Sequence, residues 1–225
     1  MLMQRKYDAV LFDFDGTVAD TGVGIFNSIQ YAAECVGHAP LSNEVLRTFI
    51  GPPVYDSFKR ELGLDDKECE FAVNKYREKY SESGIYQLTM YDGMRELLAE
   101  LKSNDIKIGI ASSKPESFIL RLLDILEISG FVDFVSCPAA DKANREKFEL
   151  INSCAEHFGI EKSKIVMVGD RLFDINGANV AGVDSIGVTF GYGSKEELEN
   201  AGATRIASSV DEIRDIIFQP FCGQE

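Results

Sequence analysis

Short, continuously apolar segments alternate with amphipathic helical patterns over most of the chain, and this alternation constrains the fold most strongly. The apolar segments are Tyr7–Phe12, Ile106–Ala111, Phe131–Ser136, Ile165–Val168, Ser185–Val188 and, more weakly, Thr204–Ala207. Between and after them lie helical patterns at Gly93–Lys102, Pro115–Glu127, Arg145–Phe158, Phe173–Val180, Lys195–Ala201 and Val210–Phe218. Strands that are apolar on both faces and alternate with helices are typical of a parallel sheet covered on both sides. We therefore predict an α/β fold with a doubly wound, Rossmann-like parallel sheet.

The segment from residue 20 to residue 86 interrupts this alternation. It contains no convincing strand, but helical patterns occur at Gly24–Cys35, Asn43–Phe49, Tyr55–Glu61 and Asp66–Ser81. Candidate N-cap residues are Asp20, Ser42 and Asp65 or Asp66, and candidate terminators are Gly63 and Gly84. We predict a helical cap domain at 20–86, inserted into a core formed by 1–19 and 87–225. The breaks at Gly51–Pro53 and Ser83–Gly84 are expected to let the cap move.

Charge and cysteine content exclude several classes of protein. The formal net charge of -14 repels nucleic acid at long range. Five scattered cysteines with no C-x-x-C pair favour a reducing compartment over a disulfide framework or a zinc site. No apolar run approaches the roughly 20 residues of a membrane span, and the N-terminal residues do not form a signal peptide. We expect a soluble cytoplasmic protein, monomeric or homodimeric, with no nucleic-acid or membrane partner.

The run Asp13-Phe14-Asp15-Gly16-Thr17 directly follows the first apolar segment. Ligand sites in open α/β sheets lie at the carboxyl ends of strands. Two carboxylates separated by one residue repel each other there unless a cation or a substrate binds them. Gly16 allows a sharp turn and a close approach of the backbone to a phosphate. The loop lacks the further oxygen ligands of an EF-hand.

Two further motifs follow strand ends. The first, Ile110-Ala111-Ser112-Ser113-Lys114-Pro115, offers a hydroxyl and free backbone amides at a helix start, which suit phosphate oxygens, although Ser112 could equally be a plain capping residue. The second, Gly169-Asp170-Arg171-Leu172-Phe173-Asp174, places two acids four residues apart. Asp174 could alternatively be an ordinary acid at a helix start.

Acids at two strand ends, without histidine or cysteine, indicate a hard-cation site for Mg²⁺ rather than zinc. Such a cluster of anions also needs a fixed cation, for which Lys147 is the candidate and Lys142 and Lys114 are rivals. The two histidines have no obvious acidic partners, and the sequence contains neither G-x-x-x-x-G-K-[ST] nor G-x-S-x-G. Kinase and esterase mechanisms of those types are therefore disfavoured.

With these motifs in this order, the sequence resembles the haloacid dehalogenase superfamily of phosphatases over nearly its whole length. The motifs are DFDGT, ASS at 111–113, Lys147 and GDRLFD, and the segments FIGPP at 49–53 and GVTFGYGSKEELENAGA resemble the phosphoglycolate-phosphatase-like branch. Some members of that branch are nucleotidases. The stretch Cys137-Pro138-Ala139-Ala140-Asp141-Lys142 departs from the Asp-Gly-rich sequence common in relatives.

The resemblance implies a role for each motif. Asp13 would be the nucleophile, and Asp15 would be the acid for the leaving group and then the base for water. Ser112, with Ser113 and Gly16, would bind the phosphoryl group, and Lys147 would hold nucleophile and phosphate together. Asp13, Asp170 and the carbonyl of Asp15 would ligate Mg²⁺, with Asp174 in support. In the cap, Arg47, Gly51 and Pro52 are candidates to face the leaving group, although Arg47 could equally be a solvated helix charge.

The expected function is hydrolysis of a small phosphate monoester, phosphoglycolate-like or a nucleoside monophosphate, through a phosphorylated Asp13. A sugar-phosphate mutase resembling β-phosphoglucomutase would share these catalytic residues. A non-catalytic binding module on the same fold is a further alternative, which the four intact motifs disfavour. The acid at Asp15 argues against a dehalogenase.

Overall fold

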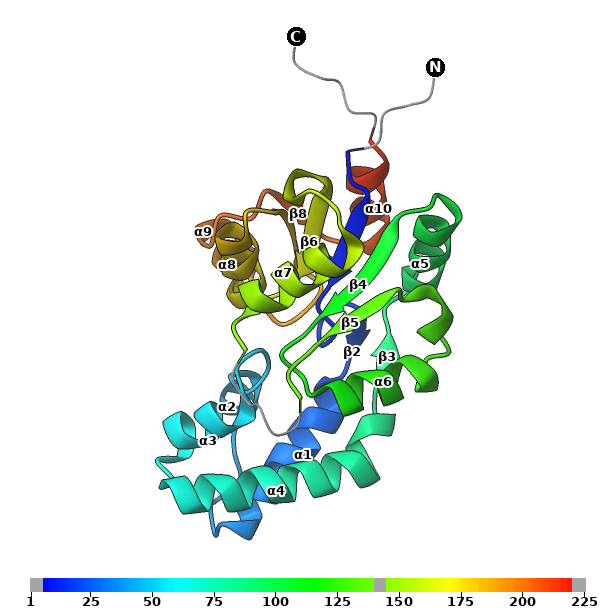
Figure 1. Cartoon of the computed structure of the whole chain (residues 1–225). Coiled ribbons are helices and arrows are strands. Elements are labelled where there is room, and N and C mark those ends of the chain that lie inside the picture. The colour runs from blue at the N-terminus through cyan, green and yellow to red at the C-terminus, as the bar shows by residue number, and fades with distance from the viewer. Residues whose placement is uncertain (1–5, 140–144, 220–225) are drawn as a thin grey trace, which may run out of the picture.

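The computed structural model describes residues 6–139 and 145–219, and its central feature is a six-stranded, wholly parallel sheet (Figure 1). The strand order is β5-β4-β1-β6-β7-β8. The strands are β1 (Ala9–Phe12), β4 (Lys107–Ala111), β5 (Phe134–Ser136), β6 (Ile165–Gly169), β7 (Asp184–Val188) and β8 (Arg205–Ala207). The predicted doubly wound fold is confirmed, and each predicted apolar segment coincides with one strand to within a few residues at its ends.

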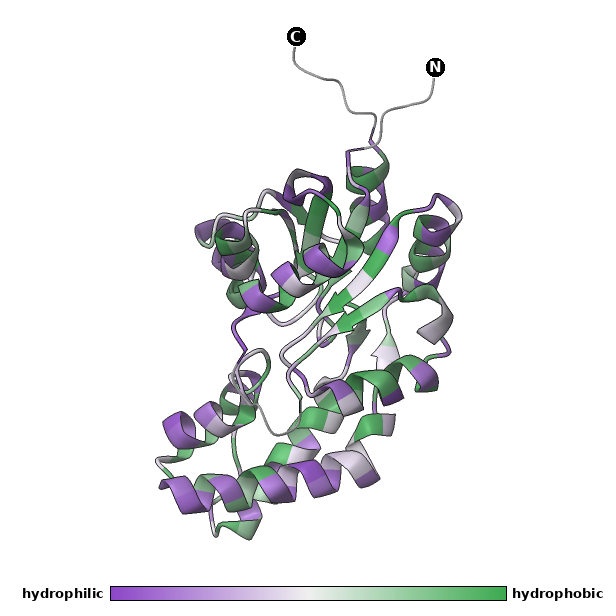
Figure 2. Cartoon of the chain, in the orientation of Figure 1, coloured by the Kyte–Doolittle hydropathy of each residue, from purple (hydrophilic) through white to green (hydrophobic). Residues whose placement is uncertain are grey.

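Side chains of the strands alternate between two hydrophobic clusters. Along β1, Ala9 and Leu11 pack on one face of the sheet, and Val10 and Phe12 pack on the other. The first face is covered by α7 (Lys147–Phe158) and α8 (Leu172–Ala181), and the second by α5 (Met94–Ser103), α6 (Glu116–Ile125) and α10 (Val210–Phe218). The short helix α9 (Lys195–Asn200) packs beside β7 and β8. Figure 2 shows hydrophobic residues along the strands and hydrophilic residues on the outer turns of the helices.

Four helices lie beyond one end of the sheet, as the lower part of Figure 1 shows. They are α1 (Gly22–Cys35), α2 (Asn43–Arg47), α3 (Val54–Leu62) and α4 (Asp66–Glu82), followed by a 3₁₀ turn at Gly84–Tyr86. A side chain at Gly24 would meet the carbonyl oxygen of Gly84, because α1 passes directly against that turn. Ser42 and Asp65 cap α2 and α4, and Gly63 ends α3 in the left-handed conformation. We propose that this helical layer is the cap domain, residues 20–86.

The chain enters and leaves the helical layer through two short strands that the sequence pattern did not indicate. β2 (Ala19–Asp20) pairs antiparallel with β3 (Thr89–Met90). Asp20 therefore belongs to a strand, and Thr21 occupies the N-cap position of α1, although the Asp20 carboxylate accepts a hydrogen bond from the Gly22 amide. The predicted break at residues 51–53 lies between α2 and α3, inside the helical layer, rather than at this crossing.

The remaining short elements are 3₁₀ turns at Ser129–Phe131 and Lys162–Lys164. Over 6–139 and 145–219, no helix has both the length and the apolar character needed to cross a bilayer. Cys35, Cys69, Cys137 and Cys154 are free thiols, and Cys222 lies outside the described residues.

Candidate active site

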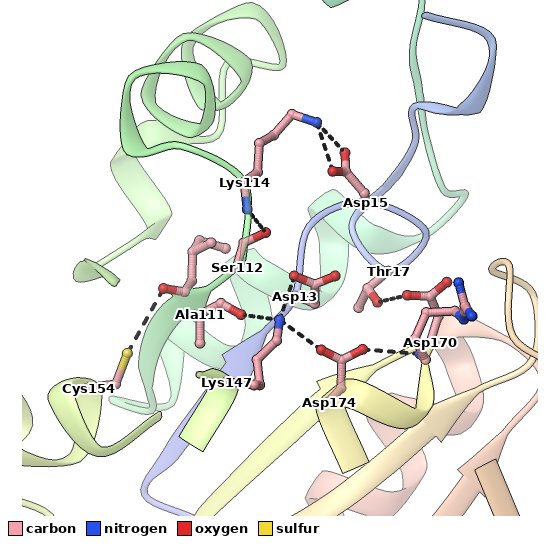
Figure 3. Close-up of polar contacts among 12 residues, drawn as sticks. Asp13, Asp15, Thr17, Ala111, Ser112, Lys114, Lys147, Cys154, Asp170 and Asp174 are labelled. Atoms are coloured by element: carbon pink, nitrogen blue, oxygen red, sulfur yellow. Dashed lines mark hydrogen bonds and ion pairs between the residues drawn. The ribbon is translucent and has the colours of Figure 1, made fainter. Parts of the chain in front are cut away.

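The sequence motifs converge because β1 lies between β4 and β6. Strand β1 pairs with both neighbours in parallel, so Asp13, Ser112 and Asp170 leave the sheet at the same edge (Figure 3). The Asp13 amide donates to the carbonyl of Val168 on β6, which continues the strand pairing up to the acid. The carboxyl end of the sheet is where ligands bind in open α/β folds.

Lys147 occupies the centre of this group of side chains. It is the first residue of α7, and its ammonium donates to Asp13 Oδ1 at 3.0 Å and to the Ala111 carbonyl at 2.9 Å. It also lies 2.8 Å from Asp174 Oδ1 as an ion pair. Burial would lower the pKa of Lys147, but the charges of Asp13 and Asp174 outweigh this effect and raise it. Lys147 is therefore a permanent cation inside the site.

A glycine makes room for this lysine. A Cβ at Gly177 on α8 would lie 2.6 Å from Cγ of Lys147, so a larger residue would displace the lysine stem. Of the rival cations, Lys114 contacts a different acid, and Lys142 lies outside the described residues.

Three buried carboxylates lie close together, and two of them, Asp13 and Asp174, contact the lysine. One oxygen from each of Asp13, Asp170 and Asp174 lies within 4.8 Å of the others. Burial, opposed by Lys147 and reinforced by Asp174 and Asp15, raises the pKa of Asp13 to about 6. Burial, with Asp174 and Asp13, likewise raises the pKa of Asp170 well above its ordinary value. Three carboxylates against one ammonium leave two negative charges, which a divalent cation would balance.

The hydrogen bonds of these acids leave ligand positions open. Asp170 accepts from the Tyr192 amide at 2.7 Å through Oδ2 and from the Thr17 hydroxyl at 3.4 Å through Oδ1. Asp174 Oδ2 accepts a hydrogen bond from the Arg171 amide at the start of α8. Asp174 is therefore an acid at a helix start, as one interpretation predicted, and also a member of the cluster. In the part of the chain that is described, the buried Asp174 Oδ1 has the Lys147 ammonium at 2.8 Å as its ion-pair partner and accepts no hydrogen bond from any other group. This all-oxygen donor set fits Mg²⁺.

Asp15 lies apart from the cluster and faces the helical layer. The ammonium of Lys114 binds both of its oxygens, at 3.0 and 2.7 Å, and the Thr21 hydroxyl donates to Oδ1 at 2.6 Å. Lys114 is itself buried and lies 4.6 Å from the centre of the Tyr80 ring. The Asp15 carboxylate is not among the three that converge, so the acids Asp13 and Asp15 have different surroundings.

The segment after β4 places Ser112 and Ser113 beside Asp13. The buried Ser112 hydroxyl oxygen accepts from the Lys114 amide, which leaves its hydrogen available to a ligand. Helix α6 begins at Glu116, with Pro115 in the N-cap position. Ser112 therefore does not cap this helix.

Two residues predicted to bind substrate, Gly16 and Arg47, have different environments in the structure from those expected. Gly16 adopts a positive φ, and a Cβ there would lie 2.2 Å from Asp170 Oδ2, so the glycine lets two motifs approach each other. Arg47 is exposed on α2 and is not part of the pocket lining. The structure does not bring Arg47 to the other predicted residues.

A pocket opens above Asp13 between the sheet edge and the helical layer. Its core side includes Asp13, Asp15, Ser112, Lys114 and Lys147. Its other wall comes from the helical layer and is mainly apolar, with residues from α1, the 49–55 segment and α4. The predicted residues Gly51 and Pro52 line it.

Sequence reasoning missed the contacts that Thr21, Tyr192 and Lys114 make. Tyr192 links Asp170 to the first crossing strand, because its hydroxyl accepts from the Thr21 amide and donates to Asp20 Oδ1. The sequence of the GYG segment indicates a family resemblance but not these contacts. Lys114 follows a strand end, but no local pattern in the sequence shows that it reaches Asp15.

The fold is of the α/β class, and its candidate site gathers carboxylates at the carboxyl ends of adjacent parallel strands. The chain belongs to the haloacid dehalogenase-like hydrolase family, whose model matches residues 10–188. The predicted resemblance is thereby confirmed.

The similar proteins include enzymes named as phosphatases and one named as a kinase. A 5'-nucleotidase of Pseudomonas aeruginosa is 32% identical, over 94% of this chain and 96% of its own length. The tyrosine-protein kinase PtkA of Mycobacterium tuberculosis is 29% identical, over 92% of this chain and 72% of its own. A predicted phosphatase from Clostridium acetobutylicum is similar in structure with a TM-score of 0.89 at 34% identity, covering 94% of this chain and 98% of that one. The predicted class of enzyme, a phosphatase, is confirmed.

Proposed function

We propose that the chain is a Mg²⁺-dependent phosphohydrolase that transfers the phosphoryl group of a small phosphate monoester to Asp13 and then to water. The observation that carries the proposal is the arrangement at the pocket floor. There Asp13 lies against the fixed cation Lys147, while a second acid, Asp15, faces the same pocket from separate surroundings. The substrate is phosphoglycolate-like or a nucleoside monophosphate.

In the first step, an Asp13 carboxylate oxygen bonds to phosphorus while the bond from phosphorus to the leaving oxygen breaks. A pKa of about 6 leaves most Asp13 ionised at neutral pH, so no separate base is needed. Lys147 balances charge on the attacking oxygen and on the phosphoryl group. The Ser112 hydroxyl donates to a phosphoryl oxygen.

Asp15 handles the proton in both steps. As an acid it would give a proton to the departing alkoxide, and as a carboxylate it would take one from the attacking water. The ion pair with Lys114 and the hydrogen bond from Thr21 fix the orientation of the Asp15 carboxylate, and the second step requires this carboxylate form. Water attack then releases inorganic phosphate and restores Asp13.

Asp13, Asp170 and Asp174 would hold Mg²⁺, with the carbonyl of Asp15 as a further ligand. The ion would neutralise charge on the phosphoryl oxygens during both steps. A cytoplasmic location and a monomeric or homodimeric state remain predictions.

Phosphate release from phenyl phosphate tests this proposal. We expect turnover with Mg²⁺, none with EDTA, and none for Asp13→Asn in either condition. Beryllofluoride, a phosphoryl mimic, should bind wild type in the presence of Mg²⁺ and should not bind Asp13→Asn. Wild-type rates in Asp13→Asn would overturn the nucleophile assignment. Transfer to a sugar phosphate faster than to water would favour a mutase, and folded, Mg²⁺-loaded protein without turnover would favour a binding module.

A further inference from the structure

The pocket above Asp13 has two chemically different ends. The sheet edge supplies the charged groups that the proposed function uses. The opposite wall contains buried apolar side chains from three parts of the helical layer, and Phe118 of α6 joins them. Those from the helical layer are Ile25, Phe49, Ile50 and Val73. A leaving group bound there must therefore present apolar surface.

Among the described residues, one cation of this lining makes no hydrogen bond or ion pair. Lys147 is paired with Asp13 and Asp174, and Lys114 is paired with Asp15. The half-buried Arg77 on α4 also lines the pocket, but it makes no hydrogen bond or ion pair within the described ranges. Its guanidinium can donate several hydrogen bonds and accept none.

A second donor lies next to it in the chain. Tyr76 is almost fully buried and lines the same pocket, yet its hydroxyl has no hydrogen-bond partner among residues 6–139 and 145–219. By contrast, the hydroxyl of Tyr55, another lining residue, already donates to Asp66. Burial raises the pKa of Tyr76, so its hydroxyl stays neutral and can donate.

These two groups restrict the chemistry of the leaving group. The acids of the lining are Asp13, Asp15 and Asp174, and all come from the core side. The helical layer thus offers free donors without a carboxylate or side-chain amide to accept. A sugar covered with hydroxyls would need acceptors as well as donors and would face the apolar wall poorly. A two-carbon acid could bind Arg77 but would leave most of that wall in contact with water.

We infer that Arg77 and Tyr76 are specificity-determining residues that bind hydrogen-bond acceptors on the base of a nucleoside monophosphate, whose ring packs on the apolar wall. This inference rests on the proposed function, because the phosphate must lie at Asp13. A planar heterocycle with carbonyl and ring-nitrogen acceptors combines the flat apolar surface and the acceptors that this wall requires.

Substrate comparison tests the inference. We expect kcat/KM for uridine or guanosine 5'-monophosphate to exceed that for ribose 5-phosphate, which lacks the base, by about 100-fold or more. Arg77→Met should lower the ratio of kcat/KM for the nucleotide to that for phenyl phosphate by about 10- to 100-fold. Tyr76→Phe should lower this ratio by about 3- to 10-fold. Lys67→Met, which removes an exposed cation from the same helix outside the pocket, should leave the ratio unchanged.

Other outcomes overturn the inference in distinguishable ways. Equal losses for nucleotide and phenyl phosphate in Arg77→Met would mean a structural role for Arg77. If phosphoglycolate were the best substrate and the most sensitive to Arg77→Met, the residue would recognise a carboxylate instead. If wild type hydrolysed no ester, the proposed function itself would fail. Calorimetric binding of uridine and guanosine 5'-monophosphates to the Asp13→Asn protein with Mg²⁺ still tests the pocket, and failure of both to bind would overturn the inference.

Discussion

The Thr21 hydroxyl donates to Asp15 Oδ1 at 2.6 Å, although Thr21 occupies the N-cap position of α1, where a hydroxyl ordinarily binds the helix backbone. Two backbone amides at the start of the helix bind other groups. The Tyr192 hydroxyl accepts from the Thr21 amide, and Asp20 accepts from the Gly22 amide. Thr21, the first residue after β2, is thus available to orient Asp15, an acid of the candidate site.

Replacing Thr21 should affect catalysis more than stability. Thr21→Val keeps the shape and removes the hydrogen bond to Asp15. We expect kcat/KM to fall about tenfold for esters with poor leaving groups and less for nitrophenyl esters, which need little proton donation. The urea midpoint should change little, because the hydroxyl does not cap the helix. Equal losses across leaving groups would contradict a role in aiming Asp15.

Asp13→Asn should abolish turnover and stabilise the protein in the absence of metal. The loss of the attacking oxygen should lower kcat by at least about 10³-fold. The substitution also removes one of three mutually repelling buried carboxylates, so we expect a gain of about 1–2 kcal/mol in EDTA. Thermal unfolding in EDTA measures this gain. A marked loss of stability would mean that the contact with Lys147 outweighs the repulsion.

Magnesium should raise the melting temperature of the wild-type protein through the acid cluster. At a concentration ten times the dissociation constant, binding adds about 1.4 kcal/mol. Asp170→Asn should remove most of this increment, because Asp170 is one of the three converging acids. Asp92→Asn, at an exposed position outside the site, should retain it. An unchanged increment in Asp170→Asn would place the ion elsewhere.

Arg171 should control closure of the helical layer over the pocket. Its guanidinium donates to the Ile50 carbonyl, beside the pocket, and pairs with Glu197 of the core at 2.9 Å. We expect Arg171→Met to raise KM about tenfold with a smaller change in kcat, since bound substrate would be held less firmly. Arg214→Met breaks an exposed ion pair with Glu100, away from the pocket, and serves as the control. Steady-state kinetics would contradict this role if both variants behaved alike.

The stabilisation that Asp133 gives to the fold should be lost in acid. Burial would raise its pKa, but hydrogen bonds from Lys102 and the Ile108 amide outweigh burial and lower it. This stabilisation is present above the ordinary pKa of 3.8 and is lost as the pH falls through the lower folded value. Asp133→Asn should therefore lose about 1 kcal/mol at neutral pH and progressively less below pH of about 4. Urea unfolding at several pH values checks this, and a pH-independent difference would contradict it.

The sequence predicted the sheet well because its inner strands, β4, β1, β6 and β7, are buried on both faces and therefore appear as short apolar runs. It missed β2 and β3, since two-residue strands are too short to show a period. The predicted ends of helices differ from the observed ends by one or two residues. Pro115, for example, was predicted as the first residue of a helix and occupies the N-cap position of α6.

The site was predicted where residues lie directly at strand ends. Asp13, Ser112 and Asp170 come together because adjacent parallel strands end at one edge. The pairing of Lys114 with Asp15 joins residues 99 positions apart, and no local pattern indicates which of several lysines reaches the acid. Arg47 was predicted to face the pocket but does not line it. A helical pattern does not reveal which residues of a short helix face a pocket.

The pairing of β2 with β3 has a consequence for how this enzyme can diversify. The segment between β2 and β3 begins and ends at this pair of strands, so its two attachment points to the core are neighbours. This segment can be lengthened, shortened or replaced without shifting the register of any strand of the main sheet. Evolution can thus alter what enters the pocket while the carboxylates of the candidate site keep their places.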